Sequence, residues 1–127
     1  MLSIVRSDAT GEMEFRGSSA QFKEFAAKVR GGSDVSTSLD EAPAPSPYDS
    51  SLSRVIISGG SGKVVIALID GGQSLLVCGA GEFMAVLAAT IEGFAEDGVR
   101  GEHAHVEFFP DHHYLMEEAE PLVLALV

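Results

Sequence analysis

Three apolar segments follow one another between residues 52 and 79, separated only by short glycine-rich turns. They span residues 52–58, 63–69 and 73–78, and the turns read Gly59-Gly60-Ser61-Gly62 and Asp70-Gly71-Gly72. Connections of this length and composition are typical of β-hairpins. The sequence therefore predicts an antiparallel meander in this part of the chain.

The middle segment of the three is apolar at every position rather than at alternate positions. It reads Val-Val-Ile-Ala-Leu-Ile over residues 64–69. A strand of this kind is expected to be covered on both faces. Helices would cover one face. The other face could be covered by a long loop, by a second copy of the chain, or by a partner.

Two stretches have the apolar period of amphipathic helices, one over about residues 19–30 and one over about residues 81–96. The first carries Phe22, Phe25, Ala26 and Val29, the spacing of one helix face. Ser18 and Gln21 have the spacing of a capping box at its start. Further strands are expected over residues 2–6 and 12–16, which form a hairpin, and over residues 103–109 and 121–127.

The order of these elements predicts an α+β fold, with a mostly antiparallel sheet of about seven strands and two helices packed on one face. At 127 residues the chain has the size of a single domain, residues 1–127. Residues 31–51 have no apolar period and contain three alternating prolines. They are expected to form a long loop, either mobile in part or laid across the surface with Tyr48 as an anchor.

All four histidines lie in residues 103–115, which read His-Ala-His-Val-Glu-Phe-Phe-Pro-Asp-His-His-Tyr-Leu. The stretch begins with a period of two, so His103, His105 and Glu107 fall on one face of a strand and the apolar residues on the other. One face is core, and the other is a candidate site.

A metal centre is one hypothesis for that face. His103 and His105 are about 7 Å apart along a strand, and Glu107, His112 or His113 would complete a ligand set. The pattern is weakly specific, because His-x-His occurs readily by chance. The alternatives are exposed strand histidines and a surface that faces a protein partner.

The net charge of −11 is concentrated in the second half of the chain, where eleven Asp/Glu face only Arg100 after residue 63. Such a field repels nucleic acid, whose binding requires neutralised phosphates, and attracts a basic protein. A solvated acidic surface is the simpler alternative.

No segment is long and apolar enough to be a signal peptide or to span a membrane, so the expected location is the cytoplasm. A mean hydropathy of +0.20 is high for so acidic a chain, which keeps a homodimer open.

Catalytic patterns are lacking in the sequence, so we expect no enzymatic activity and no cofactor. The loop before Lys63 lacks the spacing of a phosphate-binding loop and leads into a strand. Cys78 lies in an apolar run and is expected to be a small buried thiol.

The stretch from His103 to Leu115, the acidic link that follows it and the final Pro-Leu-Val-Leu from Pro121 resemble the C-terminal motif of the immunity protein 32 family of bacterial polymorphic toxin systems. The resemblance extends over roughly residues 52–127. Two positions depart from the family pattern, His113 where the family has proline and Ala119 where it has serine.

The resemblance implies a non-catalytic cytoplasmic antidote that binds and blocks a cognate toxin. The charge adds that the toxin is basic, and a nuclease is one such class of toxin. The predicted partner-binding residues are His103, His105, Glu107, Phe109, Asp111, His112, Tyr114, Glu117 and Glu118. The alternative is a metal- or ligand-binding domain that uses the His103, His105 and Glu107 face, with His112 as a further metal ligand.

Overall fold

The computed structural model describes residues 2–31, 34–40 and 48–127. The α+β class is confirmed, but the strands form two mixed sheets instead of one. The helices are α1 (Ser19–Gly31) and α2 (Gly81–Asp97). A single 3-10 turn, η1, covers Asp70–Gly72. The strands are β1 (Ser3–Arg6), β2 (Met13–Gly17), β3 (Val35–Ser38), β4 (Ser50–Ser51), β5 (Arg54–Gly59), β6 (Val65–Ile69), β7 (Ser74–Gly79), β8 (His103–Val106) and β9 (Leu122–Leu126).

Helix α1 begins at the predicted capping box. The Gln21 N–H donates to Ser18 Oγ at 3.2 Å, and the Ser18 N–H donates to Gln21 Oε1 at 2.9 Å. These two bonds satisfy backbone donors that a helix start leaves free. The predicted stripe is buried in full, so both the start and the inward face of α1 follow from the local sequence.

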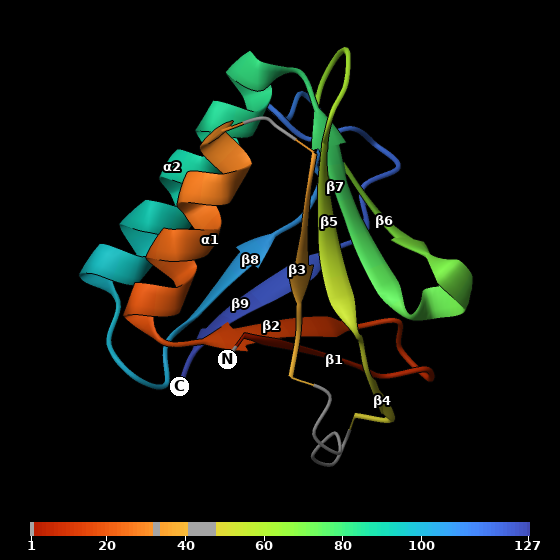
Figure 1. Cartoon of the computed structure of the whole chain (residues 1–127), viewed down its shortest axis with the longest axis vertical. Coiled ribbons are helices and arrows are strands. Elements are labelled where there is room, and N and C mark those ends of the chain that lie inside the picture. The colour runs from red at the N-terminus through yellow and green to blue at the C-terminus, as the bar shows by residue number, and fades with distance from the viewer. Residues whose placement is uncertain (1, 32–33, 41–47) are drawn as a thin grey trace.

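Helix α2 packs directly against α1. The rings of Phe22 and Phe94 lie edge to face with centroids 5.9 Å apart, Ser19 Oγ donates to the carbonyl of Ala95 at 2.6 Å, and Arg30 pairs with Glu92. Figure 1 shows the two helices side by side at the left of the view, with the strands of both sheets to their right. The helices therefore form one layer.

The first sheet has five strands in the order β4-β1-β2-β9-β8, and the second has four in the order β3-β5-β7-β6. Each contains one parallel pair, β2 with β9 and β5 with β7. The prediction of a single, mostly antiparallel sheet of about seven strands is therefore wrong in sheet number and strand number. Apolar patterns show which side of a strand is buried, but they do not show which strand lies beside it.

The predicted meander over residues 52–79 fails at the loop after β5. That loop crosses the end of β7 and leads to its far side, so β7 lies between β5 and β6. The Gly60 N–H donates to the carbonyl of Gly79 at 3.0 Å, and the Ala80 N–H donates to that of Gly62 at 2.9 Å. A Cβ atom on Gly60 would lie 2.8 Å from Cys78 Sγ. The glycines thus permit a close crossing of β7 instead of a tight hairpin.

Strand β6 lies at an edge of its sheet, and not between β5 and β7 as the predicted meander required. Its outer edge is partly covered by the chain between β8 and β9. The Val64 N–H donates to the carbonyl of Tyr114 at 2.7 Å, and the N–H groups of Met116 and Glu120 donate to the carbonyls of Val64 and Ile66 at 2.9 and 2.7 Å. These bonds attach the C-terminal segment of one sheet to the edge of the other.

The stretch predicted as a long loop, residues 31–51, contains two short strands, β3 and β4. Strand β3 reads Val-Ser-Thr-Ser, and Leu39 after it is buried. Such a polar edge strand has little apolar period to detect. The Tyr48 hydroxyl donates a hydrogen bond to Glu14 Oε2, which agrees with Tyr48 as a surface anchor. Residues 32–33 and 41–47 lie outside the described residues, and the mobility of this stretch stays a prediction.

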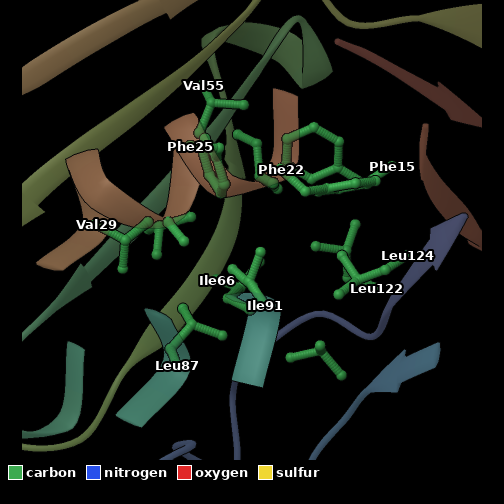
Figure 2. Packing of buried hydrophobic residues seen from close by; sticks show 14 of the residues in the cluster. Phe15, Phe22, Phe25, Val29, Val55, Ile66, Leu87, Ile91, Leu122 and Leu124 are labelled. Atoms are coloured by element: carbon green, nitrogen blue, oxygen red, sulfur yellow. The ribbon is translucent and has the colours of Figure 1, made fainter. Parts of the chain in front are cut away.

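The hydrophobic core receives side chains from the two helices and from the inner faces of both sheets (Figure 2). Phe15 of β2 is fully buried in it, with its ring centroid 5.4 Å from that of Phe22 and 4.9 Å from that of Phe25. The second sheet contributes Val55 and Ile66. The helices therefore pack against both sheets, whereas the prediction placed them on a single sheet.

Neither of the two described helices is long and apolar enough to cross a membrane.

Candidate functional site

Strand β8 forms the outer edge of the five-stranded sheet and carries the first two histidines on its exposed face. It pairs antiparallel with β9, so that His103 lies opposite Ala125 and His105 opposite Val123. Val106 points to the other side and is buried. The predicted alternation is thus confirmed for residues 103–106, and both histidines are exposed.

The strand ends at Val106, three residues before the predicted end. Strand β9 begins at Leu122, the partner of Val106, so residues 107–109 have no strand of this sheet to pair with. A tight turn follows, in which the His112 N–H donates to the carbonyl of Phe109 at 3.0 Å. Pro110 takes the second position and Asp111 the third, with φ 65°. Proline followed by a residue with positive φ is the arrangement of a type II turn.

His112 is buried, with 7% of its surface exposed. Its Nδ1 atom accepts hydrogen bonds from the N–H groups of Tyr114 at 3.2 Å and Leu115 at 3.1 Å. Its own carbonyl accepts a bond from Lys63 Nζ at 2.7 Å. The neutral ring therefore carries its proton on Nε2, and its Nδ1 acts as an acceptor that shapes the loop.

Three aromatic rings surround the His112 imidazole. The centroids of Phe109, Tyr114 and Phe108 lie 4.5, 4.6 and 6.4 Å from that of His112. Burial in this setting lowers the pKa of His112, and the charges of Lys63 and His113 lower the pKa further. His112 is thus a neutral residue that connects the loop to the core.

The nine predicted partner-binding residues divide into two groups. Two of them, His112 and Tyr114 at 9% exposure, are buried and hold the loop. The other seven are exposed: His103, His105, Glu107, Phe109, Asp111, Glu117 and Glu118. We refer to these seven as the acidic face. The division separates residues available to a partner from residues that support them.

A groove of about 280 Å³ runs along one side of the acidic face. Its polar lining comes from His105 and Glu107 together with Thr10 and Glu12 of the turn between β1 and β2, and Leu122 and Val123 contribute apolar surface. The parallel pairing of β2 with β9 brings this turn beside the C-terminal segment. No local pattern indicates the contribution of Glu12, because it depends on a pairing between distant strands.

The hypothesis of a metal centre at His103, His105 and His112 receives no support from this arrangement. Within residues 2–31, 34–40 and 48–127, no three His, Cys, Asp or Glu side chains are grouped so that they could hold a metal ion. His112 is buried, with Nδ1 bound to backbone amides, whereas His103 and His105 face outward from β8.

A second surface of different character lies on the outer face of the four-stranded sheet. Five of its outward side chains, on three neighbouring strands, are partly exposed and uncharged: Ile56, Val65, Ala67, Leu76 and Cys78. The predicted burial of Cys78 is therefore only partial. At one end of this face Arg54 and Asp70 form an ion pair with an N–O distance of 3.7 Å. We refer to these five residues as the apolar sheet face.

The model of the family "Immunity protein 32" matches residues 74–127. The matched part begins at β7 and includes α2, β8, β9 and all seven residues of the acidic face. The resemblance expected from the sequence is thus confirmed over these residues, while residues 1–73 lie outside the match. No curated protein and no solved structure matches the chain.

Proposed function

We propose that this chain is a non-catalytic immunity protein of the bacterial cytoplasm that binds and neutralises a cognate toxin. One observation carries the proposal: the segment that matches the immunity family, residues 74–127, also presents the acidic face to solvent. Immunity proteins of this kind act by binding, so the residues that matter are exposed ones that a toxin can reach.

Charge supports a basic toxin as the partner. Five exposed carboxylates lie on the loop between β8 and β9, those of Glu107, Asp111, Glu117, Glu118 and Glu120. The second half of the chain holds one arginine against eleven acidic residues. Complementary charge accelerates association and disfavours acidic partners. A nuclease is a fitting class of toxin, because an enzyme that binds nucleic acid needs lysine and arginine.

The arrangement of His112 supports a role without catalysis. Its Nδ1 atom is engaged by two backbone amides and is therefore not available to take a proton from a substrate. A general base must lie within hydrogen-bond reach of the proton that it removes.

Co-expression tests this proposal directly. The gene next to the one that encodes this chain is expressed alone and together with it, and growth is measured. We expect growth arrest by the neighbour alone, rescue by co-expression and a complex that co-purifies. A harmless neighbour, or a toxic one that this chain neither binds nor neutralises, would contradict the proposal.

We also propose that the chain forms a homodimer through the apolar sheet face. Two copies with a charge of −11 each repel one another, so they are expected to meet where the surface carries the least charge. The apolar sheet face has no net charge, because Arg54 at its rim is paired with Asp70. An apolar sheet face can also pack against its own two-fold copy.

Sedimentation of the purified chain checks this dimer. We expect a concentration-dependent dimer that Leu76→Glu converts to a monomer without loss of helical signal. A wild-type chain that stays monomeric at every concentration would rule the dimer out.

A further inference from the structure

Phe109 is a large apolar side chain that is more than half exposed, at 57%. It lies in the turn that follows β8, two residues from Glu107 on one side and two from Asp111 on the other, and both of these neighbours are exposed. An aromatic side chain within a patch of like charge is unusual for a surface that only faces water. Aromatic residues at the centre of polar surroundings are common among the residues that dominate binding energy.

The position of Phe109 is fixed before any partner arrives. The type II turn joins its carbonyl to the His112 N–H, and its ring contacts the His112 ring with centroids 4.5 Å apart. His112 is itself held by the two amides bound to Nδ1 and by Lys63 on its carbonyl. A side chain held in this way loses little conformational freedom on binding, which favours affinity.

We propose that Phe109 is the apolar anchor of the toxin interface, that it enters an apolar pocket rimmed by lysine or arginine on the toxin, and that His112 is the residue that positions it. This inference rests on the proposed function and specifies its surface. The rim is expected to be basic because the carboxylates of Glu107 and Asp111 flank the anchor on this chain.

The positioning role of His112 depends on an unprotonated Nδ1. A proton on Nδ1 would replace an acceptor by a donor that faces two backbone N–H groups, and the bonds to Tyr114 and Leu115 would be lost. The groups around the ring do not compensate for the new charge: they are the rings of Phe108, Phe109 and Tyr114 and the basic side chains of Lys63 and His113. Toxin binding is therefore expected to weaken as the pH falls through the pKa of His112, which burial holds below the ordinary histidine value of about 6.5.

Binding of an inactive form of the neighbouring gene product, measured by calorimetry at about pH 7.5, tests the anchor. Phe109→Ala is expected to weaken the Kd by at least about thirtyfold. Met116→Ala is the matched control, because Met116 is an exposed apolar residue of the same connection, and it should change the Kd by less than about threefold.

Two variants of His112 test the positioning role. In His112→Asn the side-chain oxygen can still accept from the amides that follow it, as in an Asx turn. This variant should retain binding and show a smaller loss of affinity than wild type between about pH 7.5 and pH 5.5. His112→Leu removes the acceptor, and should weaken the Kd by about tenfold or more and speed hydrogen exchange at the amides of Tyr114 and Leu115.

The outcomes separate this inference from the function on which it rests. If Phe109→Ala binds within about twofold of wild type while Glu107→Lys with Asp111→Lys still abolishes binding, the acidic face stands and the anchor is wrong. If His112→Asn keeps the full pH dependence of wild type, His112 does not position the loop. If the neighbouring gene product does not bind at all, both the function and the anchor fail.

Discussion

At the scale of single residues, His112 shows how one imidazole can organise a loop. Its burial and its two amide donors could not be read from the sequence, in which four histidines lie within eleven residues. The sequence did predict that His103 and His105 share a face, because a period of two determines direction along a strand. It did not show which histidine is buried, because that depends on Lys63 and on the edge of β6, which lie far away in the chain.

Replacement of His112 by leucine should lower the free energy of unfolding by about 1–3 kcal/mol, because two buried amides would lose their acceptor. The measurement is urea denaturation at neutral pH. His113→Leu serves as the control, since His113 is exposed, and it should change stability by less than about 0.5 kcal/mol. Equal losses in both variants would contradict a special role for His112.

The stability of the wild-type chain should also depend on pH through His112. Its pKa is lowered in the folded state by burial, so the unfolded chain binds the proton first as the pH falls. The contribution of His112 is complete above about pH 6.5 and declines below that value. The urea midpoint should fall less below about pH 6.5 in His112→Asn than in wild type. The same pH profile for wild type and His112→Asn would show that His112 is not the group responsible.

Tyr48 offers a second titration that can be observed. Burial and the hydrogen bond to Glu14 raise the pKa of Tyr48 to about 12. Absorbance of the folded chain as a function of pH should show a phenol that ionises well above pH 10, and Tyr48→Phe should remove this step. Because the unfolded phenol ionises at about 10, the associated stability is present below that pH and is lost as the pH rises toward 12. If the high-pH ionisation step persists in Tyr48→Phe, it belongs to another group.

At the scale of elements, the sequence predicted both helices to within about a residue at each end, and most strands to within a few residues. These elements are defined by local signals: the Ser18 box, apolar stripes and glycine stops. The arrangement of the strands was missed, because β2 with β9 and β5 with β7 join segments that no local signal connects. The loop after β5 is an example, because its glycines are equally compatible with a hairpin turn and with a crossing over β7.

The crossing of the loop over β7 predicts that substitutions at Gly60 and Cys78 affect stability together. Gly60→Ala should destabilise the fold by about 1–3 kcal/mol, because the new methyl group would overlap Cys78 Sγ. Cys78→Ala removes that sulfur, so the double variant should recover most of the loss in thermal or urea denaturation. If the stability changes of the two single variants simply add in the double variant, Gly60 does not lie against Cys78.

Gly93 provides the opposite case within α2. A Cβ atom at this position meets nothing within 4 Å, and glycine within a helix costs about 0.5–1 kcal/mol relative to alanine. Gly93→Ala should therefore raise the unfolding free energy by about that amount. A loss of stability would indicate that Gly93 is packed closely against a neighbour.

At the scale of the whole molecule, the two sheets and the helix layer give the chain two contrasting outer surfaces. The acidic face lies on β8 of the five-stranded sheet and on the loop after it, and the apolar sheet face lies on the four-stranded sheet. The sequence predicted that the second half is acidic and that β6 has a second apolar face to cover. The separation of the two surfaces onto different sheets became visible only in the fold.

The most direct test of the account is the salt dependence of toxin binding by Glu107→Lys with Asp111→Lys. The control is Glu24→Lys with Asp34→Lys, which changes the net charge equally at exposed positions outside the matched segment. We predict that wild type and control bind alike and weaken as salt rises, whereas the first variant binds at least about tenfold more weakly and with a smaller salt dependence. If the first variant and the control have the same affinity and the same salt dependence, the acidic face is not where the toxin binds.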